Sequence, residues 1–164
     1  MGLIVKKFGG TSVADAQRLR NVAQRITRTY DEGNNVVVVV SAQGDTTDEL
    51  IEKANEVNTN PSKREMDVLL SAGEQISMSL LAMVLENMGY PVVSLTGWQA
   101  GFLTDSHYGS ARIKTVNTER LQTELDKRNI VIVAGFQGLN RYDDITTLGR
   151  GGSDWEGRHA WLRG

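Results

Sequence analysis

Short runs of consecutive apolar residues alternate along this chain with longer segments in which apolar residues recur every three or four positions. The clearest runs are Val36–Val40 and Ile130–Ala134, and weaker ones occur at Leu3–Val5 and Val92–Leu95. Runs that are apolar on both faces and rich in β-branched residues are typical of strands buried on both sides of a parallel sheet. The pattern therefore predicts four such strands.

Four helices are predicted in the segments between these runs, because apolar residues follow helical spacing there. The first three predicted helices cover Val13–Tyr30, Asp45–Val57 and Met66–Met88, and the fourth follows Thr118 and runs to about Lys127. Thr46 with Glu49 three residues later predicts a capping box at the start of the second helix. Asn117 or Thr118 is expected to cap the fourth helix.

Strands that alternate with helices predict an α/β layered domain, with helices on both faces of a mostly parallel sheet. Two segments carry no clear helical period. Gly97–Arg112 is rich in Gly, Ser and Thr and is expected to form a loop or hairpin at the rim of the sheet. Phe136–Leu148 is expected to form a hairpin around the polar turn Asn140–Asp144.

Composition narrows the class of protein further. The chain has 164 residues, a formal charge of −2, 40% hydrophobic residues and no cysteine, which fits one globular domain. The balanced charge argues against a nucleic-acid interface or a polybasic membrane patch. The lack of cysteine excludes disulfides, thiolate zinc sites and a cysteine nucleophile. We expect no signal peptide and no membrane span, and therefore a cytoplasmic protein without nucleic-acid or membrane partners.

A lysine and two glycines follow the first predicted strand, in the order Lys7-Phe8-Gly9-Gly10. A strand, a glycine turn and a helix N-terminus can present backbone N–H groups to a phosphate, and glycines allow close approach. The order differs from a Walker A loop because the lysine precedes the glycines. A phosphate-binding turn and a tight turn with a solvated lysine are both consistent with the pattern.

Two further motifs place polar groups where open α/β folds commonly bind ligands. The segment from Ser41 to Thr47 follows the five-valine strand, and ligands bind at the carboxyl ends of such strands. A capped helix start is the alternative there. Glu74 falls on the apolar stripe of the third helix. A carboxylate in that position meets a ligand cation, forms a structural salt bridge or stays at a solvated edge.

The most specific motif is Thr146–Asp154, in which three glycines surround Arg150. Such a loop can place backbone N–H groups against an oxyanion, and the arginine fork suits carboxylates and phosphates. A flexible glycine-rich segment is the alternative. His107 and His159 are far apart in the sequence and lack neighbouring carboxylates, so no metal-ligating side chains are predicted.

Taken together, the motifs resemble the aspartokinase family in order and spacing over residues 1–154. The matching segments are Lys7–Val13, Val36–Leu50, Ser71–Glu74, Ala134–Gly138 and Thr146–Asp154. The resemblance implies the amino-acid kinase fold, a three-layer αβα sandwich with a mostly parallel open sheet. It also implies ATP-dependent phosphorylation of the β-carboxylate of L-aspartate to 4-phospho-L-aspartate, the first step of lysine, threonine and methionine biosynthesis, with ATP and Mg²⁺ as cofactors.

The resemblance also implies roles for individual residues. Lys7 would reach the transferring phosphoryl group, and Asp154 would organise the polar network around the lysines or the metal. Nucleotide contacts are implied for Lys7, Phe8, Gly9, Gly10 and Ser41. Contacts with L-aspartate are implied for Thr47, Glu74, Arg150, Gly151, Gly152 and Ser153. Within that set Glu74 would bind the α-ammonium group and Arg150 the α-carboxylate.

After Asp154 the sequence departs from the family's pattern. Residues 1–154 are therefore interpreted as a partial, C-terminally truncated kinase catalytic domain, and residues 155–164 as an unrelated tail. Part of the nucleotide site would be missing, which leaves turnover by this chain open. The alternatives are a non-catalytic fragment that folds by self-association or with a partner chain, and another phosphotransferase of the same fold. Exposed strand edges would favour a homo-oligomer or other association.

Overall fold

Two four-stranded sheets organise residues 2–149, the part of the chain that the computed structural model describes. In the first sheet β1 (Leu3–Phe8), β2 (Asn35–Val40), β6 (Ile130–Ala134) and β3 (Val92–Leu95) lie side by side in that order, and all neighbours are parallel. These are the four strands predicted from the apolar runs. β1 is three residues longer than predicted, because its pairing with β2 continues to Phe8, and β2 begins one residue earlier than predicted, at Asn35.

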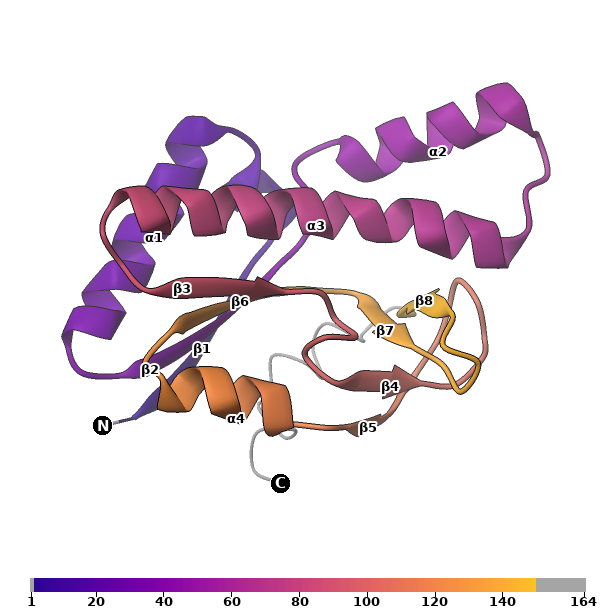
Figure 1. Ribbon diagram of the computed structural model, residues 1–164. Coiled ribbons are helices and arrows are strands. Elements are labelled where there is room, and N and C mark those ends of the chain that lie inside the picture. The colour runs from indigo at the N-terminus through magenta and orange to yellow at the C-terminus, as the bar shows by residue number, and fades with distance from the viewer. Residues whose placement is uncertain (1, 150–164) are drawn as a thin grey trace.

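Helices cover both faces of the first sheet (Figure 1). On one face α1 (Ala16–Asp31) and α3 (Lys63–Asn87) pack over the strands, and on the other lies α4 (Glu119–Asp126). The remaining helix, α2 (Thr46–Val57), packs against α3. The predicted α/β architecture, a three-layer αβα sandwich, is therefore confirmed.

The five valines of β2 show why an unbroken apolar run forms this sheet. Val36, Val38 and Val40 belong to the core beneath α1 and α3, whereas Val37 and Val39 belong to the core beneath α4. All five are at most 1% exposed. Side chains of a strand alternate between the two faces, so a strand covered on both faces needs apolar residues at every position.

The second sheet was not predicted as a sheet. It contains β5 (Ile113–Val116), β4 (Phe102–Thr104), β7 (Gln137–Leu139) and β8 (Ile145–Thr147) in that order. The β7–β8 pair is antiparallel and confirms the predicted hairpin. The central β4–β7 pair is parallel and joins segments far apart in the sequence. Strands of three residues are too short to leave a periodic pattern, which is why β4 was expected only as loop or hairpin.

A single helix, α3, bridges the two sheets. Its 25 residues span about 37 Å. Met78, Leu81 and Leu85 in its C-terminal half lie in the core of the first sheet. Its N-terminal half contacts β8 of the second sheet, where Asp67 accepts a hydrogen bond from the backbone of Thr147. The relative position of the two sheets therefore depends on this helix.

By length and composition alone, α3 could cross a membrane, since an 18-residue window within it has a mean hydropathy of 1.6. The sequence predicts no membrane span. Core helices of soluble proteins pass the same test, and α3 has eight buried residues in contact with the body of the fold. Its apolar character is thus explained by packing on the sheets.

Three details of the predicted helix starts were wrong. α3 begins at Lys63 rather than Met66, because Ser62 is its N-cap and the Ser62 side chain accepts a hydrogen bond from the Glu65 N–H. α1 begins at Ala16 rather than Val13, because a 3₁₀ turn occupies Gly10–Val13 and the Asp15 side chain accepts a hydrogen bond from the Arg18 N–H. The expected capping box of α2 is absent, since Asp45 occupies the N-cap position and makes no side-chain cap hydrogen bond.

Two isoleucine substitutions test this packing. Ile132 is fully buried in β6, so Ile132→Ala is expected to lower the free energy of unfolding by about 2–5 kcal/mol. Ile76 on α3 is 44% exposed, and Ile76→Ala is expected to change it by less than about 0.5 kcal/mol. Urea unfolding followed by circular dichroism would measure both, and equal effects would contradict the assigned core.

Candidate functional site

The strands β1, β2 and β6 of the first sheet all end at the same edge, and a loop follows each of them there. Phe8 pairs with Val40, and Val40 pairs with Ala134. The next residues remain joined, because the Ser41 N–H donates to the Phe8 carbonyl at 3.1 Å and the Gly135 N–H donates to the Val40 carbonyl at 2.9 Å. The carboxyl-end edge of an open α/β sheet is where such folds bind ligands.

The two glycines after β1 have different surroundings. A Cβ on Gly10 would lie 2.7 Å from the Ala42 carbonyl oxygen, and the Gly10 carbonyl accepts a hydrogen bond from Gly44 at 3.0 Å. Gly10 therefore allows the β1 and β2 loops to approach each other closely. A Cβ on Gly9 would meet nothing within 4 Å, so the backbone at this exposed residue is open to a ligand.

Lys7 lies beside the third loop at this edge. Its side chain is exposed, and its Nζ is 5.6 Å from the centre of the Phe136 ring, which follows β6. Ammonium groups are attracted to aromatic faces at this separation. The structure thus places the lysine of the β1 motif next to Phe136, a residue to which the sequence analysis gave no role.

The segment from Ser41 to Thr47 connects β2 to α2. Ser41 is half-buried directly after the strand, and Thr47 is exposed in the first turn of the helix. Ala42 and Thr46 pack against α3, since a Cβ on Gly73 would lie 2.9 Å from the Ala42 Cβ and 3.6 Å from the Thr46 Cγ2. This contact brings the segment up to the residue that precedes Glu74.

Glu74 occupies the part of α3 between the two sheets. On its C-terminal side Met78 packs into the first sheet, and on its N-terminal side the Ser71 carbonyl accepts a hydrogen bond from Gln137 of β7 at 3.0 Å. Residues at spacings of three and four share one helix face, so the half-buried Glu74 lies on that face above the edge of the first sheet.

Phe136 and Gln137 shape the passage from β6 to β7. Phe136 has a φ of 61°, a left-handed conformation that is rare for a bulky residue and redirects the chain into the second sheet. The fully buried Gln137 side chain accepts from the Gly97 N–H at 3.1 Å and donates to the Ser71 carbonyl. The glycines on either side of this pair, Gly135 and Gly138, were the available sequence signal for an irregular turn.

Asp67 is a second residue that the sequence analysis missed. It is 1% exposed and lies one and two helical turns before Ser71 and Glu74 on the same face of α3. It accepts hydrogen bonds from the Thr147 N–H and hydroxyl and from the Gly109 N–H. The sequence signal that could have identified Asp67 is its spacing of seven residues, about two helical turns, from Glu74.

The arginine motif lies mostly outside the described residues. Arg150, Gly151, Gly152, Ser153 and Asp154 all fall there. The described part of the motif ends beside Phe136, because the Leu148 N–H donates to the Phe136 carbonyl at 2.8 Å and the Gly149 N–H donates to Ala111 at 3.0 Å.

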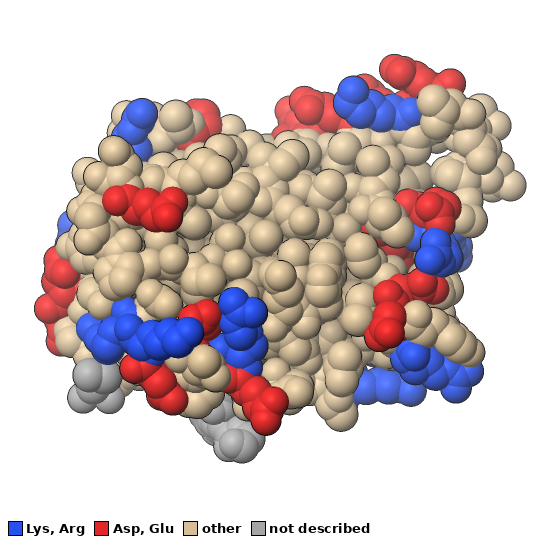
Figure 2. All heavy atoms as spheres, viewed as in Figure 1, with Lys and Arg blue, Asp and Glu red and all other residues tan. Residues whose placement is uncertain are grey.

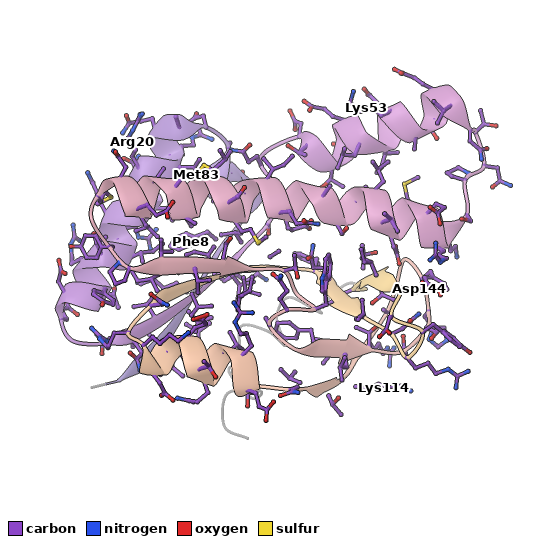
Figure 3. The ribbon with its side chains drawn as sticks, viewed as in Figure 1. Phe8, Arg20, Lys53, Met83, Lys114 and Asp144 are labelled. Carbon is purple, nitrogen blue, oxygen red and sulfur yellow. The ribbon has the colours of Figure 1, made fainter. Side chains whose placement is uncertain are left out.

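A charged cluster holds the turn between β7 and β8 against the start of α3. Arg64 donates to both oxygens of Asp144, at 2.7 and 3.1 Å, and the Tyr108 hydroxyl donates to Asp144 at 2.7 Å. The hydrogen bonds from Arg64, and next from Tyr108, hold the pKa of the Asp144 carboxyl below its ordinary value. Figure 3 shows Asp144 at the end of the second sheet.

The described residues fit a phosphate better than a metal held by side chains alone. Lys7 offers a cation, and the open backbone at Gly9 can approach an anion. Within residues 2–149 no group of three or more His, Asp or Glu side chains could hold a metal ion. The face in Figure 2 carries scattered acidic and basic side chains and a broad uncharged area.

A groove of about 480 Å³ lies between α1 and α3, and Gln43 of the segment after β2 also lines it. It is lined by Leu19 and Arg20 of α1 and by Leu80, Met83 and Val84 of α3. Figure 3 shows Met83 and Arg20 on the outer side of these helices.

Comparison with known proteins identifies relatives of the chain. Residues 2–155 match the amino acid kinase family. The chain is 56% identical over 154 residues to an aspartokinase of Bacillus sp. (strain MGA3), and 58% identical over 154 residues to an aspartokinase of Geobacillus stearothermophilus. Each match covers 94% of this chain and 38% of the relative, so the chain spans well under half of their length.

Solved structures agree with the fold. The aspartate kinase from Synechocystis superimposes with a TM-score of 0.81 at 44% identity, over 98% of this chain and 26% of that one. E. coli aspartokinase III in complex with aspartate and ADP gives a TM-score of 0.79 over 92% of this chain and 44% of that one. The second likeness is at 24% identity and concerns the fold alone.

The glycine pair provides a matched test of the β1 turn. Gly10→Ala would press a methyl group against the Ala42 carbonyl, and it is expected to lower the free energy of unfolding by about 1–3 kcal/mol. Gly9→Ala, with a φ of −78° and open space at Cβ, is expected to change it by less than about 0.5 kcal/mol. Equal effects of the two substitutions in urea unfolding would contradict the close approach of the two loops.

The charged cluster predicts a pH-dependent contribution to stability. Because the pKa of Asp144 is lowered in the folded state, its pairing stabilises the fold at neutral pH. This contribution is lost as the pH falls below about 4 and through the lowered value. Arg64→Gln is expected to raise the pKa of Asp144 toward its ordinary value in a carboxyl NMR titration. Lys63→Gln, at the neighbouring residue, serves as the control and should leave the Asp144 titration unchanged.

Proposed function

This chain belongs to the amino acid kinase family, and from that premise we propose that it carries the substrate side of an aspartokinase active site. The reaction is transfer of the γ-phosphoryl group of ATP to the β-carboxylate of L-aspartate, which yields 4-phospho-L-aspartate and ADP. The identity of 56–58% to aspartokinases over almost the whole chain favours this activity over others of the family.

The convergence of the loops after β1, β2 and β6 beneath α3 is the observation that carries this proposal. Lys7 and the open backbone of Gly9 lie at the edge formed by these strand ends. Glu74 follows Gly73, the residue that packs against the β2 loop. A cation and backbone donors for a phosphoryl group therefore share one edge with a carboxylate suited to an ammonium group.

On the phosphate side, Lys7 offsets the negative charge that develops as the phosphoryl group moves. Gly9 and Gly10, with Phe8 before them, bring backbone to the nucleotide phosphates, and Ser41 lines the cleft between the nucleotide and aspartate. Phosphoryl transfer depends mainly on positioning and on electrostatic stabilisation, so a lysine and backbone donors suit it. Mg²⁺ bound to ATP would neutralise further phosphate charge.

On the aspartate side, Glu74 binds the α-ammonium group, and Thr47 contributes a hydroxyl. Arg150, with Gly151, Gly152 and Ser153, holds the α-carboxylate, and Asp154 organises the polar network around the lysines. For these last five residues the proposal rests on their sequence motif. The nucleophile is the β-carboxylate of the substrate. One of its oxygens forms a bond to the γ-phosphorus while the bond from that phosphorus to the bridging oxygen of ADP breaks.

We also propose that the protein acts in the cytoplasm and that copies of it associate through an exposed strand edge. β1 is an outer strand of the first sheet, and its Leu3 and Ile4 are each 37% exposed. Unpaired edges with apolar side chains favour pairing with another chain.

The proposal is tested by replacing Glu74. Glu74→Gln removes the negative charge and is expected to weaken L-aspartate binding about 10- to 100-fold in calorimetry, because a charge-assisted hydrogen bond contributes ~1.5–3 kcal/mol. ATP-dependent aspartyl-hydroxamate formation should fall with it. Glu86→Gln is the matched control, since Glu86 is exposed near the end of the same helix.

Two results would overturn the proposal. One is binding of L-glutamate by the unmodified chain under conditions where L-aspartate does not bind. The other is unchanged L-aspartate affinity in Glu74→Gln.

A further inference from the structure

We propose that Asp67 is a positioning residue for the aspartate site, which sets the strand leading into Arg150 at a defined place relative to Glu74. The inference rests on the proposed function, since it concerns the position, relative to Glu74, of the strand that precedes Arg150 in the sequence. Asp67 itself would touch neither substrate nor nucleotide.

The hydrogen bonds of Asp67 join three separate segments of the chain. Its Oδ2 accepts from the Thr147 N–H at 3.1 Å and from the Gly109 N–H at 2.9 Å, and its Oδ1 accepts from the Thr147 hydroxyl at 2.7 Å. The side chain is 1% exposed, so water cannot easily replace these partners. One carboxylate on α3 therefore holds both the β4–β5 loop and β8.

Both elements that Asp67 connects, α3 and β8, carry or precede residues of the candidate site. On α3, Glu74 lies seven residues after Asp67, about 10 Å along the same helix face. On β8, Thr147 precedes Leu148 and Gly149, whose N–H groups are bonded to Phe136 and Ala111. Arg150 is the next residue in the sequence. The Asp67 carboxylate thus links the helix that carries Glu74 directly to Thr147, three residues before Arg150 in the sequence.

If position 67 served packing alone, a carboxylate there would be energetically unfavourable compared with an apolar side chain. Burying a charge has a desolvation penalty, and apolar residues of similar volume often stabilise a fold equally well. The outer end of the same hairpin is already held to α3 by the pair Arg64–Asp144. Asp67 instead fixes the inner end of β8, next to the site, and its three directed hydrogen bonds specify a position that apolar packing would leave adjustable.

The test separates positioning from general stability by comparing two buried carboxylates. Glu124 on α4 is 4% exposed and is bonded to Arg120 and Asn129, on the opposite face of the first sheet. Asp67→Ala and Glu124→Ala should both lower the melting temperature. Below both melting temperatures, calorimetry should show L-aspartate binding weakened at least tenfold in Asp67→Ala and changed less than threefold in Glu124→Ala.

Two conservative variants refine the test and remain informative if Asp67→Ala does not fold. Asp67→Asn can accept both backbone N–H groups through its carbonyl oxygen and donate to the Thr147 hydroxyl, so affinity should stay within threefold of the unmodified chain. Thr147→Val removes the hydroxyl while keeping the side-chain shape, and is expected to weaken L-aspartate binding about threefold to fivefold.

The outcomes distinguish this inference from the proposed function. If the unmodified chain does not bind L-aspartate, the proposed function fails and the inference fails with it. If the unmodified chain binds and both Asp67→Ala and Thr147→Val bind equally well, only the inference is overturned. Equal weakening in Glu124→Ala and Asp67→Ala would likewise overturn it, because the effect would then follow stability rather than position.

Discussion

The arrangement of this molecule depends on one face of one helix. Along α3 the positions 67, 71, 74, 78, 81 and 85 recur at spacings of three and four and therefore point to the same side. The C-terminal three are apolar and pack into the core of the first sheet, whereas Asp67 and Ser71 accept hydrogen bonds from the second sheet. Glu74 falls where the contact changes from apolar to polar, and the two sheets meet beneath it.

The parallel pairing of β1, β2 and β6 creates the other half of the site. Because these strands run in one direction, the glycine pair, Ser41 and the Gly135–Phe136 turn emerge at one edge. Close packing of the loops accounts for Gly10, which has no room for a side chain, while Gly9 is not needed for packing. The backbone at Gly9 is therefore accessible for close approach.

Much of the architecture could be predicted because it follows from local patterns. Strands covered on both faces must be apolar at every position, and the valines of β2 meet that condition. The second sheet could not be predicted in the same way. Its parallel β4–β7 pair joins residues 103 and 139, and each strand is only three residues long. Such pairing is selected by contacts between distant segments and leaves little trace in either sequence.

For the candidate site, the sequence by itself determined which residue types are available: a lysine before two glycines, a carboxylate on an apolar helix, and an arginine among glycines. The sequence also determined the order of the strands along the chain, and hence which loops follow which strands. Only the tertiary structure decided that Phe136 lies beside Lys7, and that Asp67 and Gln137 tie α3 to the second sheet. The reason is physical. The position of a buried polar side chain is defined by its hydrogen-bond partners, and the partners of Asp67 and Gln137 lie 40 to 80 residues away along the chain.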